Sequence, residues 1–185
     1  MPVPDSRGRD RDLSGRPRNS RPRDELGRPL PRPRPGDRTS ATQAGGPPMS
    51  EVIGPGEAAD LGASLLIEGR PFHAHEVFED AWKSADETER DLWRGLAQVA
   101  VGLTHARRGN ARGALALLRR GAGNLRRYLG RGSFQPAVAD RLSYGVDAAY
   151  VASTADELAA QIERDGLAAV PAQALLLRLR PHQAG

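Results

Sequence analysis

The chain has no cysteine, and its 185 residues contain no apolar run of membrane-spanning length. Without thiols it cannot be a disulfide-stapled secreted mini-protein, bind zinc through cysteine or use a thiol nucleophile. Its apolar stretches are far shorter than the roughly 18 residues that a membrane helix needs. No charged start followed by an apolar stretch marks a secretory signal. We therefore expect a cytoplasmic protein without a membrane span.

Familiar catalytic motifs are also missing. The chain has no Gly-x-Ser-x-Gly sequence and no glycine-rich loop of the phosphate-cradling type, so no nucleophile motif points to a reaction. The sequence therefore indicates a fold and a set of polar residues within it more clearly than it indicates any activity.

Positive charge is concentrated at the N-terminus. Residues 1–48 hold 11 arginines and six acids, a net charge of +5, and the remaining residues carry −1, which together give the +4 of the whole chain. The nearly neutral body lacks the basic footprint of a dedicated nucleic-acid-binding domain.

Residues 1–48 also hold 10 of the 15 prolines and few large apolar side chains. Such a segment cannot bury enough surface to offset its ordering entropy, which predicts a disordered Arg/Pro-rich arm. Three interpretations stay open. The arginines could tether the protein weakly to RNA, DNA or an anionic membrane, the arm could have no partner, or Met49 could be the true start of translation.

The body predicts a compact all-α bundle over residues 50–170, followed by a C-terminal extension over 171–185. Apolar residues recur at helical spacing, and no convincing alternating strand pattern is present. About 137 residues after Met49 are enough for one core. The bundle is predicted to contain five or six helices, over 56–68, 71–85, 89–108, 111–129, 136–152 and 155–165.

Several of these boundaries have local signals. Pro71 and Pro136 suit the first position of a helix, and Thr154 followed by Glu157 is a capping box for the last one. Gly109 suits the left-handed position after a helix and Asn110 the cap of the next, which predicts a tight turn between antiparallel helices. Leucines 175–177 are either a short strand or a last turn packed on the bundle.

The predicted helix over 71–85 has an unusual mixture of side chains on one face. Phe72, His75, Glu79 and Trp82 share that face, and His75 and Glu79 are close enough to hydrogen-bond. Because aromatic side chains favour burial, we expect this face to be at least partly buried.

A matching stripe runs along the next helix, with Gly95, Gln98, Gly102 and His105 at steps of three and four. Glycine costs about 1 kcal/mol relative to alanine inside a helix, so two glycines on one side predict the close approach of another helix. We predict that this stripe faces the first one. Gln98 and His105 would then meet His75 and Glu79. The predicted polar cluster, a candidate binding site, consists of His75, Glu76, Glu79, Gln98 and His105. The predicted structural anchors are Trp82, Gly95, Gly102, Gly109 and Asn110.

The order of these motifs resembles the all-helical family catalogued as domain of unknown function 309. The resemblance covers roughly residues 57–130 and implies a compact helical bundle but no established activity. The Arg/Pro-rich first 48 residues lie outside the family pattern. The residues that carry the resemblance are His75-Glu76-x-x-Glu79-x-x-Trp82, Gly95-Leu96-x-Gln98, His105-x-Arg107-Arg108-Gly109-Asn110 and Gly113-Ala114.

Three interpretations of the cluster follow. The main one is a structural or partner- and ligand-binding module whose paired polar groups specify one helix packing. The alternative is a metal-dependent hydrolase or oxidoreductase with a divalent transition metal on His75, Glu79 and His105. The third is metal-free acid–base catalysis by the first two of these residues. We predict no resident cofactor. The sequence leaves open which protein or small molecule is the partner, and whether the chain forms a homo-oligomer.

Overall fold

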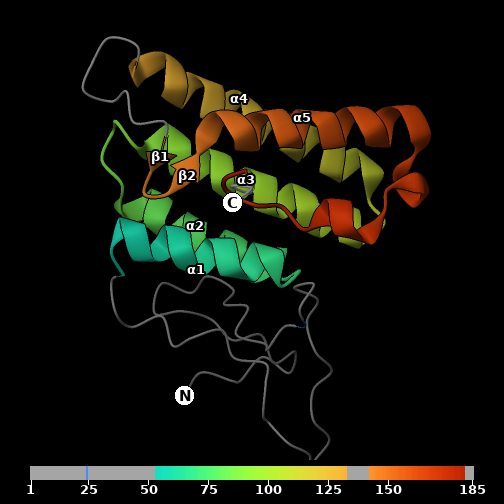
Figure 1. Ribbon diagram of the computed structural model, residues 1–185, viewed down its shortest axis with the longest axis horizontal. Helices are drawn as coiled ribbons and strands as arrows, with labels where there is room; N and C mark the ends of the chain where they lie inside the picture. The colour runs from blue at the N-terminus through green and yellow to red at the C-terminus, as the bar shows by residue number, and fades with distance from the viewer. Residues whose placement is uncertain (1–23, 25–52, 133–141, 182–185) are drawn as a thin grey trace, which may run out of the picture.

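A computed structural model describes residue 24 and residues 53–132 and 142–181. These parts form an all-α bundle, which confirms the predicted fold class (Figure 1). The predicted arm, apart from residue 24, lies outside the described residues. No helix in the described ranges has the length and apolar character to cross a membrane. The helices are α1 (Pro55–Ile67), α2 (Pro71–Ser84), α3 (Arg90–Arg107), α4 (Ala111–Gly132) and α5 (Ala148–Asp165).

Helices that follow one another in the sequence pack side by side. α3 occupies the centre, between α2 and α4, while α1 packs on α2 and α5 packs on α4 (Figure 1). The fully buried rings of Phe78 and Trp93 join α2 to α3, with ring centroids 6.4 Å apart. The apolar faces predicted from helical spacing therefore meet in one core.

α3 and α4 approach each other closely along glycines. A Cβ atom on Gly95 would lie 2.7 Å from Leu125 and 3.2 Å from the carbonyl oxygen of Gly121, and one on Gly102 would lie 2.9 Å from Leu118. The predicted close approach is confirmed, but the predicted neighbour is wrong because the stripe faces α4 and not α2. On the α4 side, Gly121 meets Gly95, whereas α2 contains no glycine.

The turn between these helices has the predicted form. Gly109 has a φ of +78°, in the left-handed region that favours glycine. The side-chain oxygen of Asn110 accepts a hydrogen bond of 2.9 Å from the backbone N–H of Gly113, which caps α4. Both signals are local, and each acts as the sequence indicated.

The chain before α5 differs from the prediction of a helix over 136–152. Its start at Pro136 lies outside the described residues. Two short antiparallel strands follow, β1 (Leu142–Ser143) and β2 (Val146–Asp147). They are joined by a two-residue turn with positive φ at both positions, the geometry that a right-twisted hairpin favours.

The predicted capping box at Thr154 is also wrong, because α5 passes through this position without interruption. Its N-cap is Asp147, whose carboxylate accepts a hydrogen bond of 2.9 Å from the backbone N–H of Tyr150. The Thr154 hydroxyl instead donates to the carbonyl of Tyr150 within the helix. One helix therefore replaces the predicted fifth and sixth.

After α5, the chain returns to the bundle through two 3₁₀ turns, Leu167–Ala169 and, within the predicted C-terminal extension, Ala172–Leu175. Beyond them, Leu177 and Leu179 are buried while Arg178 and Arg180 are exposed. The carbonyl of Leu179 accepts a hydrogen bond of 2.8 Å from the backbone N–H of Asp147, which fastens the segment to β2. The predicted packing of this leucine-rich region on the bundle is confirmed, as a turn and an extended segment.

Candidate functional site

α2 places His75 and Glu79 together, as their spacing predicts. His75 Nε2 lies 3.3 Å from one carboxylate oxygen of Glu79, and Lys83 Nζ lies 3.3 Å from the other. The side chains of His75 and Glu79 are 25% and 37% exposed, so the pair is half-buried. Burial lowers the pKa of His75 below its ordinary value, although the Glu79 carboxylate favours the protonated ring. Burial therefore favours the neutral form of the imidazole.

The other two predicted residues of α2, Glu76 and Trp82, differ in their exposure to solvent. Glu76 is exposed, and Trp82 is partly buried against the core. The guanidinium carbon of Arg94, from α3, lies 5.8 Å from the centroid of the Trp82 ring. Trp82 therefore packs against the core and has a cation–π contact with an arginine of α3.

Gln98 forms its hydrogen bond with α4. Its side-chain oxygen accepts a hydrogen bond of 2.7 Å from the amide nitrogen of Asn124. Asn124 is 1% exposed, and its own side-chain oxygen accepts from Arg127. Since an amide buried between helices is costly unless it is paired, this contact helps to fix the register of α3 against α4.

His105 also contributes to the junction of α3 and α4. Its Nδ1 accepts a hydrogen bond of 2.8 Å from the side-chain nitrogen of Asn110, the residue that caps α4. Gly113 leaves room for the ring, because a Cβ atom there would lie 2.6 Å from His105 Nδ1. The structure thus joins His75 to Glu79 but does not bring Gln98 and His105 into one cluster with them, because this side of α3 is packed against α4.

These contacts show whether the three predicted metal ligands, His75, Glu79 and His105, lie together. Within the described ranges, no three His, Asp or Glu side chains converge as ligands of a metal ion would. His75 and Glu79 form one pair on α2, whereas His105 is bonded at the turn before α4. The predicted set of His75, Glu79 and His105 is not assembled, so these residues do not fit a shared divalent ion in this arrangement.

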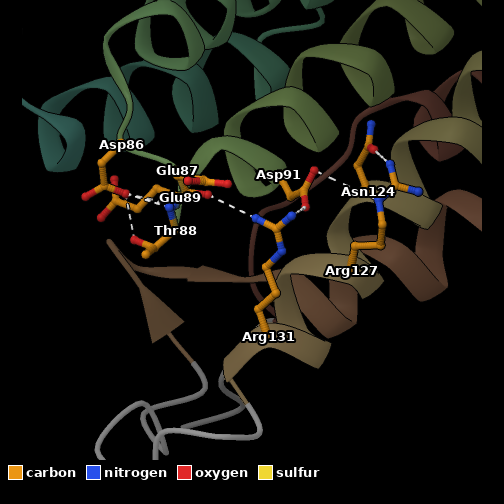
Figure 2. A network of polar contacts seen from close by, with 8 residues as sticks. All are labelled: Asp86, Glu87, Thr88, Glu89, Asp91, Asn124, Arg127 and Arg131. Atoms are coloured by element: carbon orange, nitrogen blue, oxygen red, sulfur yellow. Dashed lines mark hydrogen bonds and ion pairs between the residues drawn. The ribbon is translucent and has the colours of Figure 1, made fainter.

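A second polar network, which residue spacing did not predict, begins in the loop between α2 and α3 (Figure 2). One carboxylate oxygen of Asp86 accepts hydrogen bonds from the backbone N–H groups of Thr88 and Glu89, at 2.9 and 3.1 Å. A further bond from the Thr88 hydroxyl is the main cause that lowers the pKa of Asp86. This turn leads directly into α3.

The network continues to the end of α4 through Asp91, whose side chain is only 13% exposed. Arg131 Nη2 lies 3.5 Å from Asp91 Oδ2, and the same guanidinium donates to the carbonyl of Glu87 at 3.1 Å (Figure 2). Arg127 Nε lies 3.9 Å from the other oxygen of Asp91. Two cations thus face a largely buried carboxylate, as burial of such a charge requires. Sequence spacing could not reveal this, since only the fold brings residues 91 and 131 together.

Glu89 links this region to the hairpin. It accepts hydrogen bonds from the hydroxyl of Tyr144 and, at 3.3 Å, from the indole N–H of Trp93. The rings of Tyr144 and Trp93 are stacked with centroids 5.7 Å apart. The hydrogen bond to Glu89 is the largest effect that raises the pKa of Tyr144 to about 12. Tyr144 also has a φ of +56°, which is uncommon for any residue other than glycine.

Comparison with known families gives a match over part of the chain. Residues 60–117 match the model of a family described as a domain of unknown function (DUF309), which confirms the resemblance inferred from the motifs. The matched segment begins within α1 and ends within α4. Comparisons with curated proteins and with solved structures gave no match.

Proposed function

We propose that the segment matched by the DUF309 model is a structural module that presents binding surfaces to a protein or small-molecule partner. The observation that supports this proposal is the position of the hydrogen bonds of Gln98 and His105. Gln98 bonds to Asn124 in α4, and His105 bonds to Asn110 at the cap of α4. Paired polar groups of this kind favour one packing of two helices over its alternatives.

The pair on α2 is consistent with the same role. His75 and Glu79 are four residues apart on one helix and remain partly exposed. Such a pair contributes a few tenths of a kcal/mol to helix stability and needs no ligand. The metal-dependent alternative requires His105 to join this pair, and the geometry gives it no support. The identity of the partner and the cytoplasmic location stay predictions.

A double-mutant cycle on the interhelical amide pair tests the proposal. Gln98→Met should lower the free energy of unfolding by about 1–3 kcal/mol, because it leaves the buried donor of Asn124 without its acceptor. Asn124→Leu should also destabilise the protein. The double variant should lose less than the sum of the two, with a coupling of about 0.5–3 kcal/mol, because both polar partners are then gone.

Urea unfolding followed by circular dichroism measures these values. Arg120→Gln provides a control, since Arg120 is an exposed residue of α4, and it should change stability by less than about 0.5 kcal/mol. Strictly additive losses, or variants as stable as the unchanged protein, would show that these residues do not act as a structural pair.

A further inference from the structure

A pocket of about 670 Å³ lies outside the polar motifs, between α1, the hairpin and the C-terminal segment. Its volume is within the range of about 300–1,000 Å³ that is typical of sites for small ligands. α1 forms one wall with Asp60 and Ile67, the hairpin contributes Tyr144, and Arg178 and Arg180 come from the C-terminal segment.

The two arginines give the pocket its cationic side. Arg178 and Arg180 alternate with the buried Leu177 and Leu179, so the extended backbone directs both guanidinium groups outward while the leucines hold the segment on the bundle. Neither arginine forms an ion pair with a carboxylate in the parts of the chain that the structure describes. The Arg180 guanidinium lies beside the hairpin turn, 3.7 Å from the position that a Cβ atom on Gly145 would occupy.

Two large apolar side chains also line the pocket. Ile67 and Tyr144 are 46% and 37% exposed, which places both among the large apolar side chains that this protein leaves accessible. The Tyr144 ring stacks on Trp93, and its hydroxyl donates a hydrogen bond to the Glu89 carboxylate. These two contacts fix the position of the Tyr144 ring at the edge of the pocket.

We propose that this pocket binds a small organic anion. A carboxylate or phosphate group would be held by the guanidinium groups of Arg178 and Arg180, whose planar arrays of N–H donors match such oxyanions. The apolar body of the ligand would lie against Ile67 and Tyr144. Asp60, on the wall formed by α1, opposes a second negative charge and favours a ligand with few charges.

This site does not depend on the proposed structural role of the motif residues. Tyr144 and both arginines lie outside the segment 60–117 that the family model matches. If the double-mutant cycle on Gln98 and Asn124 shows no coupling, the pocket proposal is unaffected. If the pocket binds no anion, the proposed structural role of the motif residues is unaffected.

Calorimetric titration of the full chain at low ionic strength tests the proposal with four probes. 2-Naphthoate and 2-naphthyl phosphate carry an anion on an apolar body, 2-naphthamide lacks the charge, and inorganic phosphate lacks the apolar body. We expect the two naphthyl anions to bind at least about tenfold more tightly than either of the other probes, since each loses one of the two kinds of contact. The tighter of the two anions identifies the preferred oxyanion. Equal binding of all four probes, or no binding of the naphthyl anions, would overturn the proposal.

Charge variants then locate the site. Arg178→Gln and Arg180→Gln should each weaken binding of the preferred anion by roughly tenfold, because each removes a charge-assisted contact. Asp60→Asn should tighten it. Arg120→Gln is the matched control, since Arg120 is an exposed arginine of α4 that does not line the pocket. Thermal unfolding of each variant verifies that the fold is kept. If the control weakens binding as much as the pocket variants do, general charge attraction explains the result and the proposed site is wrong.

Discussion

Replacing Gly121 with alanine should destabilise the protein, whereas the same change at Gly123 in the same helix should stabilise it. A Cβ atom on Gly121 would lie 2.7 Å from a methyl group of Val99, 2.9 Å from the carbonyl oxygen of Gly95 and 3.0 Å from the backbone nitrogen of Val99. Two of these atoms belong to the backbone of α3, so relief requires the helices to separate. A Cβ atom on Gly123 would meet nothing within 4 Å.

The magnitude follows from two opposing effects. Alanine favours a helix over glycine by about 1 kcal/mol at either position, and this gain cancels when the two variants are compared. Overpacking of a close interface costs about 1–3 kcal/mol. The free energy of unfolding should therefore be about 1–3 kcal/mol lower for Gly121→Ala than for Gly123→Ala, and the second variant should exceed the unchanged protein by up to about 1 kcal/mol.

Urea unfolding followed by circular dichroism at the helical band measures both differences, and thermal unfolding gives an independent check. A protein of this size should show about 2–4 °C between the midpoints for each kcal/mol. If Gly121→Ala is as stable as Gly123→Ala, the two helices are not in contact along their glycines and the geometry described for α3 and α4 is wrong.

Two further predictions concern pH. Because burial lowers the pKa of His75 in the folded protein, the folded state disfavours the protonated ring, and stability should fall as the pH drops below the unfolded value of about 6.5. The urea midpoint of unfolding, plotted against pH, should therefore fall less steeply below about pH 6.5 in His75→Gln than in the unchanged protein. Identical slopes for the two proteins would contradict this prediction. Tyr144 is the opposite case, since hydrogen bonding to Glu89 raises its pKa to about 12. The stability that this shift contributes is present below about pH 10 and is lost as the pH rises towards the folded value. An absorbance titration should show a late tyrosinate step that Tyr144→Phe removes, and persistence of that step in the variant would assign it to another tyrosine.

The parts of the fold that the sequence predicted correctly depend on local chemistry. Pro71 begins α2, Gly109 takes a left-handed conformation, and Asn110 caps α4. Each of these outcomes is decided by the backbone preferences or hydrogen bonds of a few adjacent residues. The pairing of His75 with Glu79 is local in the same sense, because it lies within one helix.

The predictions that failed required knowledge of which helix covers which face. Helical spacing showed that Gly95 and Gly102 lie on one side of α3, but it could not show that α4 and not α2 would pack there. The capping pattern at Thr154 and Glu157 was equally ambiguous, because such residues also hydrogen-bond inside a continuous helix. Glu157, for example, accepts from the hydroxyl of Ser153 one turn earlier.

The order of packing has a consequence for how the chain reaches its fold. Since α1 to α5 each contact mainly their sequence neighbours, the bundle can assemble from successive helical hairpins with little cost in loop closure. Arg178 and Arg180 lie on the last stretch of the described chain, where the carbonyl of Leu179 accepts a hydrogen bond from the backbone N–H of Asp147 in β2. Local opening of that stretch would remove both arginines from the proposed anion pocket while the central helices stay folded, so ligand binding could be lost without global unfolding.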